Sequence, residues 1–137
     1  MSAESFRLKI FNPAGLLFDE QVVSVTLPGA DGEIGLLPMH ARYVGLLGTG
    51  VLKLILLDGG AEVTAAACGG FCSFSDDAFV ILAERIEFSN NVNKSAYGAK
   101  RNELQKIVDT ASHYEAEWKI ARSELDWIEA VDKLFAH

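Results

Sequence analysis

Thiols and imidazoles are the side chains of this sequence best suited to chemistry, and their spacing does not assemble a recognisable centre. Cys68 and Cys72 flank a Gly-Gly pair, whereas the histidines stand far apart at positions 40, 113 and 137. Four ligands at a spacing typical of zinc are not found. A cysteine nucleophile also needs a base and a group that orients the base, and no such set stands out. Burial is the simplest interpretation of both cysteines, and an enzyme using Cys68 or Cys72 ranks third among the functions considered.

Phosphate chemistry and charge-driven binding are also disfavoured. Gly48-Thr49-Gly50 lacks the further glycine and the Lys-Ser/Thr pair of a phosphate-binding loop. The 12 basic and 19 acidic side chains give a formal net charge of −7, which repels nucleic acid and anionic lipid. The longest apolar run, Val51 to Leu57, contains Lys53 and is far shorter than the roughly 18 residues of a membrane span. We therefore expect a cytosolic binding protein without catalytic site, metal or cofactor, which neither binds nucleic acid nor inserts directly into a membrane.

Two structural regimes share the chain. All three prolines and every glycine except Gly98 precede residue 90. Before that point apolar and polar residues alternate, as in Phe6, Leu8 and Ile10, which is typical of strands with one buried face. A β-sandwich over residues 1–88 is predicted. Its strands include 6–10, 23–27, 51–57, 63–67 and 79–83, and its turns lie at 13–15, 28–29, 58–60, 69–70 and 76–77.

Helical spacing replaces the alternation after residue 90 and predicts an antiparallel two-helix hairpin over residues 89–137. Ser112 and Glu115 have the spacing of a capping box, which begins a second helix. One continuous helix bent near Asp109 to Ser112 is the alternative. Trp118 and Trp127 are interpreted as large apolar contacts of the hairpin. The two predicted apolar stripes are Tyr97, Leu104, Val108 and Ala111, and Trp118, Ala121, Leu125, Ile128 and Phe135.

Several short motifs occur in an order typical of one family. The segment Gly32-Glu33-Ile34-Gly35-Leu36-Leu37-Pro38-Met39-His40-Ala41 follows an opening strand at Phe6–Ile10 and precedes Gly69-Gly70-Phe71, Val80–Ala83 and the helical tail. Over the whole chain this arrangement resembles the epsilon subunit of bacterial F-type ATP synthases. The resemblance implies a non-catalytic rotor subunit at the cytoplasmic face of the bacterial plasma membrane. It also implies a sandwich bound to the gamma subunit and the c-ring, and a hairpin that acts as a movable brake on ATP hydrolysis.

The resemblance also suggests which residues contact partners. Asp31 and Glu33 match the acidic loop that faces the c-ring, and Met39 and His40 match the segment that faces gamma. In the extended state of the hairpin, four cations are candidates for contact with acidic segments of the alpha and beta catalytic subunits. These are Lys100, Arg101, Lys119 and Arg122.

Nucleotide binding is a further property of some bacterial relatives, which use the motif Ile/Leu-Asp-x-x-Arg-Ala. The matching positions, Val92 to Tyr97, lack both the aspartate and the arginine whose planar fork binds phosphate. ATP is therefore not expected to be a strong ligand. The alternative function is a stand-alone sandwich-plus-hairpin adaptor of another assembly, which co-purification with alpha, beta and gamma chains would distinguish.

Overall fold

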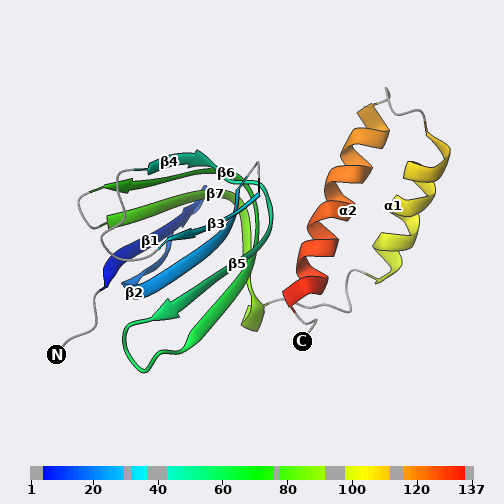
Figure 1. The fold of residues 1–137 in the computed structure, drawn as a ribbon. Coiled ribbons are helices and arrows are strands. Elements are labelled where there is room, and N and C mark those ends of the chain that lie inside the picture. Colours follow the sequence, from blue (N-terminus) through cyan, green and yellow to red (C-terminus); the bar gives the residue numbers. More distant parts are fainter. Residues whose placement is uncertain are drawn as a thin grey trace.

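The computed structural model describes residues 5–29, 32–36, 43–75, 78–91, 98–111 and 116–134. In these ranges a strand-rich body precedes a helical tail (Figure 1), which confirms the predicted fold class. No helix of the described ranges has both the length and the apolar character needed to cross a membrane. The elements are β1 (Phe6–Asn12), β2 (Gly15–Gly29), β3 (Gly32–Leu36), β4 (Tyr43–Leu46), β5 (Thr49–Leu56), β6 (Glu62–Ser75), β7 (Ala78–Phe88), a 3₁₀ turn η1 (Ser89–Asn91), α1 (Gly98–Thr110) and α2 (Ala116–Leu134).

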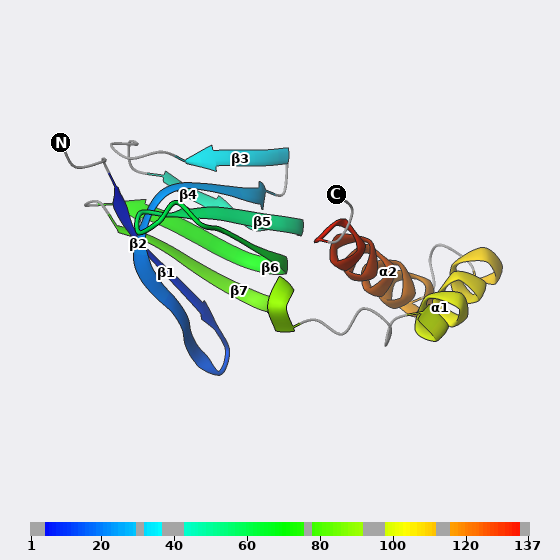
Figure 2. The same ribbon diagram turned by 90° about the horizontal axis from the view of Figure 1, so that it is seen from below.

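The strands form one sheet that closes on itself. Their order is β1-β7-β6-β5-β2-β3, with β4 on a further edge of β6. Strand β1 pairs in parallel with β7 and antiparallel with β2, so the path returns to its start. The long strands β2 and β6 each change partners along their length, because β2 leaves β1 for β5 and β6 leaves β5 for β4. The product is a flattened, closed sandwich (Figures 1 and 2).

The sandwich encloses its own apolar core. Alternation along β1 buries Phe6, Leu8 and Ile10, as the sequence predicts. Phe6 meets Phe74 of β6 edge to face, with ring centroids 5.3 Å apart. Every buried member of this core cluster lies between residues 6 and 86. The core of the sandwich is therefore complete without any helical residue.

Three local predictions within the sandwich are wrong. Pro28-Gly29 is not a turn but the end of β2, where the two residues pair with Glu33 and Gly32 of β3. Val22 rather than Val23 shares the buried face with Val25, because the β2–β5 register shifts between Val22 and Ser24. Gly69-Gly70 is not a turn but lies inside β6, where both glycines have positive φ (72° and 107°). This irregularity makes Cys68 and Phe71, three positions apart, face the same side of the sheet. The turns after Asn12 and at Leu57 to Gly60 are as predicted, whereas 76–77 lie outside the described residues.

The two helices stack in order on the outer surface of the sandwich. Helix α2 contacts β5 and β6, and α1 lies on the far side of α2 (Figure 2). Arg101 near the start of α1 pairs with Asp132 near the end of α2, while Val108 near the end of α1 contacts Trp118 near the start of α2. The helices are therefore antiparallel, and the alternative of one continuous helix is wrong. The predicted cap at Ser112 to Glu115, with Tyr97 and Phe135, lies outside the described residues.

Candidate functional site

Helix α2 has two apolar stripes that face different partners. At about 100° per residue, Ala121 and Leu125 lie near Trp118 on one side of the helix, while Ile128 lies at the border with the other stripe and is buried in the same cluster as Ala66 of β6. The Trp118 indole Nε1 donates a hydrogen bond of 3.1 Å to the Val108 carbonyl, so this side faces α1. A second stripe lies more than a quarter turn away around the helix. It comprises Trp127, Ala130, Val131 and Leu134, all buried.

The second stripe packs on an outward-facing patch of the sheet. Ala66 of β6 is fully buried there, beside its register partner Val51 of β5 and near Cys68. Trp127 is 1% exposed in the same cluster. Because an alanine methyl is small, the helix can approach the sheet closely at this point. We call this contact the helix–sandwich junction. The interpretation of Trp127 as a hairpin contact is thus wrong, since its ring packs mainly toward the sheet.

Arg85 of β7 adds a polar contact at the same place. It is the register partner of Cys68 and so lies on the sheet beside α2. Its guanidinium carbon is 4.2 Å from the centroid of the Trp127 ring, within range for a cation–π interaction. Its Nη1 also donates to Oε1 and Oε2 of Glu124, at 3.0 and 3.2 Å. One side chain of the sandwich therefore holds two residues that are one helical turn apart.

Glu124 connects three elements. Besides Arg85 of β7, it binds Lys100 of α1, whose Nζ is 3.5 Å from Oε2. Burial by itself would raise the pKa of Glu124, but the hydrogen bond and positive charge of Arg85, helped by Lys100, outweigh it and lower the pKa. The carboxylate is therefore ionised and paired at neutral pH.

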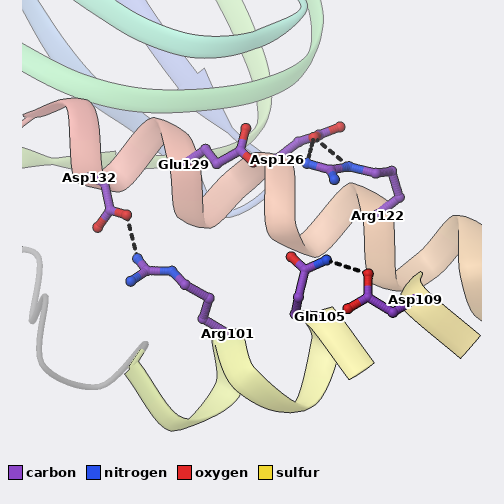
Figure 3. Close-up of polar contacts among 7 residues, drawn as sticks. All are labelled: Arg101, Gln105, Asp109, Arg122, Asp126, Glu129 and Asp132. Carbon is purple, nitrogen blue, oxygen red and sulfur yellow. Dashed lines mark hydrogen bonds and ion pairs between the residues drawn. The ribbon is translucent and has the colours of Figure 1, made fainter. Parts of the chain in front are cut away.

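Most of the cations predicted to contact catalytic subunits are paired within the hairpin. Figure 3 shows Arg101 reaching from α1 to Asp132 of α2, and Arg122 bound to Asp126 along α2. The Arg122 Nη2 is 2.8 Å from Asp126 Oδ1 and 2.9 Å from Glu129 Oε1. With the Lys100 contact, three of the four predicted cations are engaged in ion pairs. Lys119 is exposed and has no ion-pair partner in the part of the chain that the structure describes.

Glu33, one of the two residues predicted to contact the c-ring, lies near the end of α2. Glu33 is exposed on β3 opposite Pro28. Glu33 and Lys133 of α2 line one cavity of about 260 Å³. Asp31, Met39 and His40 lie outside the described residues, so the proximity of the four predicted contact residues stays a prediction.

An exposed row of apolar side chains crosses four neighbouring strands of the sandwich, β4, β6, β7 and β1. Leu46 of β4 pairs with Phe71 of β6, Phe71 with Leu82 of β7, and Leu82 with Phe11 of β1. Leu46 is 68% exposed and Phe71 is 44% exposed, and Val44 continues the row along β4. A cavity of about 290 Å³ lies against Phe11, Phe71 and Leu82. Contiguous exposed apolar surface of this kind is typical of protein-binding sites.

Both cysteines are free thiols that pack against neighbouring groups of the sandwich. Cys72 is buried in the sandwich with its Sγ 3.6 Å from the Gly45 carbonyl, and burial raises its pKa, which disfavours the nucleophilic thiolate. Cys68 accepts a hydrogen bond of 3.1 Å from the Thr49 hydroxyl at the edge of the helix–sandwich junction. No cluster of His, Cys, Asp and Glu suited to a metal occurs among the described residues.

Sequence reasoning missed three features: the second stripe of α2, Arg85 and the apolar row. The spacing Trp127, Ala130, Val131 and Leu134 is itself a helical stripe and was a usable signal. Arg85 and the apolar row carried no such signal, because a strand residue acquires those neighbours only through long-range pairing.

Comparison with known proteins gives a consistent result. The β-sandwich domain of the ATP synthase delta/epsilon chain matches residues 5–89. The ATP synthase epsilon chain of Desulforamulus reducens is 31% identical over 135 residues and covers 98% of both chains. That of Campylobacter hominis is 34% identical over 105 residues, which are 77% of this chain and 81% of the relative.

A solved structure shows the same fold. A chain in the Euglena gracilis mitochondrial ATP synthase structure, which contains OSCP, F1 and the c-ring, superimposes with a TM-score of 0.85 at 19% identity. The superposition covers 98% of this chain and 84% of that chain. Since the sandwich match spans more than half of the sequence and one relative matches nearly all of it, the chain belongs to the epsilon-chain family of ATP synthases.

Proposed function

We propose that this protein is a non-catalytic central-stalk subunit of an F-type ATP synthase, which couples ion flow through the membrane ring to ATP synthesis. Its sandwich binds the gamma subunit and the c-ring, and its hairpin restrains ATP hydrolysis by contact with the alpha and beta subunits. It sits as a peripheral subunit at the cytoplasmic face of the bacterial plasma membrane. The epsilon-chain relatives and the fold shared with a chain of an F1/c-ring assembly support this proposal.

The gamma contact is assigned to the apolar row together with Met39 and His40. Strand β4, which carries Leu46, begins directly after the segment that contains these two residues. Hydration of an exposed apolar row is unfavourable in the free subunit, and a partner that covers the row removes this surface from water. The c-ring contact is assigned to Asp31 and Glu33, since acidic side chains suit polar partner loops and Glu33 is exposed on β3.

The braking role rests on one observation: among the described residues the hairpin contacts the sandwich mainly through α2, while the buried core of the sandwich contains no hairpin residue. The hairpin can therefore leave its docking surface without unfolding the sandwich, as a two-state element. Its 19-residue α2 is about 28 Å long at 1.5 Å per residue, enough to extend from the stalk toward neighbouring subunits. Ile120 lies on the sheet-facing side of α2 and is already 65% exposed, so part of an alternative contact surface is accessible in the docked state.

Opening of the hairpin also releases cations. Separation of α1 from α2 breaks the Arg101–Asp132 and Lys100–Glu124 pairs, which leaves both cations available to acidic segments of catalytic subunits. Lys119 is already exposed in the docked hairpin.

Deletion of residues 92–137 tests the brake. The full-length and truncated chains are reconstituted with the other subunits of the complex, and ATP hydrolysis is measured. We expect assembly to be retained and hydrolysis to rise, because the sandwich keeps its core and its partner surfaces. A truncated complex that assembles fully but hydrolyses ATP at the full-length rate contradicts the brake.

A charge reversal tests the c-ring contact. Glu33→Lys leaves the sandwich core untouched, since Glu33 is exposed. We expect ion pumping per ATP hydrolysed to fall while gamma binding is retained. Normal coupling in this variant removes Glu33 from the proposed contact. Glu62→Lys, also exposed and on the sandwich, is the matched control and should couple normally.

A further inference from the structure

Arg85 occupies a position from which one side chain controls the docked state of the hairpin. We propose that Arg85 is a clamp that holds α2 on the sandwich, and that Glu124 couples release of α2 from the sheet to separation of α1 from α2. The clamp itself concerns docking within this chain. Its consequence for ATP hydrolysis rests on the proposed function.

The clamp depends on the shape of the guanidinium group. Glu124 and Trp127 are three residues apart and lie on the same side of α2. Arg85 binds both oxygens of Glu124 and also covers the Trp127 ring at 4.2 Å. A planar fork can do both at once, whereas the ammonium group of lysine offers no comparable flat surface. Arginine at this position is therefore not interchangeable with lysine.

The contacts are partly shielded, which gives them measurable weight. The Arg85 and Glu124 side chains are 36% and 30% exposed, and Trp127 is fully buried beneath them. An ion pair and a cation–π contact of this kind together shift an equilibrium about 5- to 30-fold. That is enough to change which state of a two-state element predominates when apolar docking is modest.

Glu124 makes the two movements interdependent because Arg85 and Lys100 bind the same carboxylate from opposite neighbours. While both hold it, β7, α1 and α2 are joined at one residue. Loss of Arg85 removes both contacts on the sheet side, whereas loss of Glu124 removes one ion pair on each side and leaves Arg85 on the Trp127 ring. Removing Glu124 after Arg85 is expected to release α2 from the sheet little further, although it still loosens α1.

The chain contains its own reporter of docking. Cys68 lies at the edge of the helix–sandwich junction, whereas Cys72 is buried in the sandwich core. Release of α2 uncovers Cys68 and leaves Cys72 protected. The ratio of their alkylation rates by iodoacetamide therefore separates undocking from unfolding. Both tryptophans of the chain are in α2, so their emission reports the same event independently.

The experiment compares full-length wild type with Arg85→Ala, Arg85→Lys, Glu124→Gln and the double variant Arg85→Ala/Glu124→Gln. Arg7→Ala is the matched control, since it removes an ion pair of similar exposure, that with Asp19, on β1 and β2. We expect Arg85→Ala to raise Cys68 alkylation about 5- to 30-fold with a red shift of emission, and Arg85→Lys to approach it. Cys72 should remain protected, and the double variant should label within about twofold of Arg85→Ala, which marks non-additive coupling.

Two results overturn the inference. The clamp is refuted if Arg85→Ala and Arg7→Ala show the same rate of Cys68 alkylation and the same tryptophan emission. Additive effects of Arg85→Ala and Glu124→Gln refute the coupling through Glu124. In the reconstituted complex, the clamp variants should inhibit ATP hydrolysis more strongly than wild type. If Cys68 becomes reactive but inhibition is unchanged, the clamp holds and the proposed brake is refuted instead.

Discussion

Replacement of Ala66 with leucine is expected to displace the hairpin and leave the sandwich folded. Ala66 is fully buried, but it is covered by α2 and not by the sandwich core. The three extra carbon atoms of leucine have no space between β6 and Trp127 while the helix is docked. Overpacking of this kind costs about 1–3 kcal/mol, which shifts the docking equilibrium about 5- to 150-fold toward the released state.

Fluorescence and thiol labelling measure this shift. Trp127 is 1% exposed when docked, so its release moves the emission maximum to longer wavelength. Cys68 should become reactive toward iodoacetamide in parallel. The midpoint of chemical denaturation of the sandwich should change little, since residue 66 then faces water on the outer side of β6.

The neighbouring alanine is the matched control. Ala65 is also fully buried, but it faces the sandwich core. Ala65→Leu should therefore lower the denaturation midpoint of the sandwich, in contrast to Ala66→Leu. An Ala66→Leu protein with wild-type emission and a protected Cys68 would show that α2 does not rest on Ala66, and the helix–sandwich junction would have to be abandoned.

Three further outcomes follow from the same structure. The pKa of Glu124 lies below its ordinary value of 4.5, so the contribution of its ion pair to docking is complete above that pH and is lost as the pH falls through the lowered pKa. Acid titration followed by tryptophan emission should show this loss in wild type and not in Glu124→Gln. Phe71→Ser should weaken binding to the gamma subunit in a pull-down by about tenfold with little change in stability, since Phe71 is 44% exposed, and unchanged binding would remove the apolar row from that contact. Gly70→Ala should destabilise the sandwich by at least about 2 kcal/mol in urea denaturation, because Gly70 has a φ of 107° and an added Cβ would overlap the Leu82 carbonyl. A denaturation midpoint equal to that of wild type would contradict this backbone conformation.

Local pattern predicted the elements of the fold well and their mutual contacts poorly. Phe6, Leu8 and Ile10 alternate in the sequence and are buried together in the structure. The change from period two to helical spacing near residue 90 correctly separated strands from helices. Gly69-Gly70 was misjudged because paired glycines permit positive φ in a turn and in a strand irregularity alike.

The candidate site was only partly accessible to sequence reasoning. Lys100, Arg101 and Arg122 were predicted to contact catalytic subunits in the extended state, and in the docked hairpin each has an acidic partner on a neighbouring helix or along α2. Charge at a helical position is visible in a sequence, whereas its partner on another helix is not. The apolar row was not predicted for the same reason, since Leu46 and Phe71 become neighbours only when β4 pairs with β6.

The order of residues by itself determined which side chains share a face of a strand or helix, where the chain changes from sheet to helix, and to which family the chain belongs. The tertiary structure decided which of the two α2 stripes rests on Ala66, and that Arg85 reaches Glu124 and Trp127. The physical reason is that periodicity arises from backbone geometry over a few residues, whereas contacts between faces depend on the free energy of packing segments about 40 to 60 residues apart.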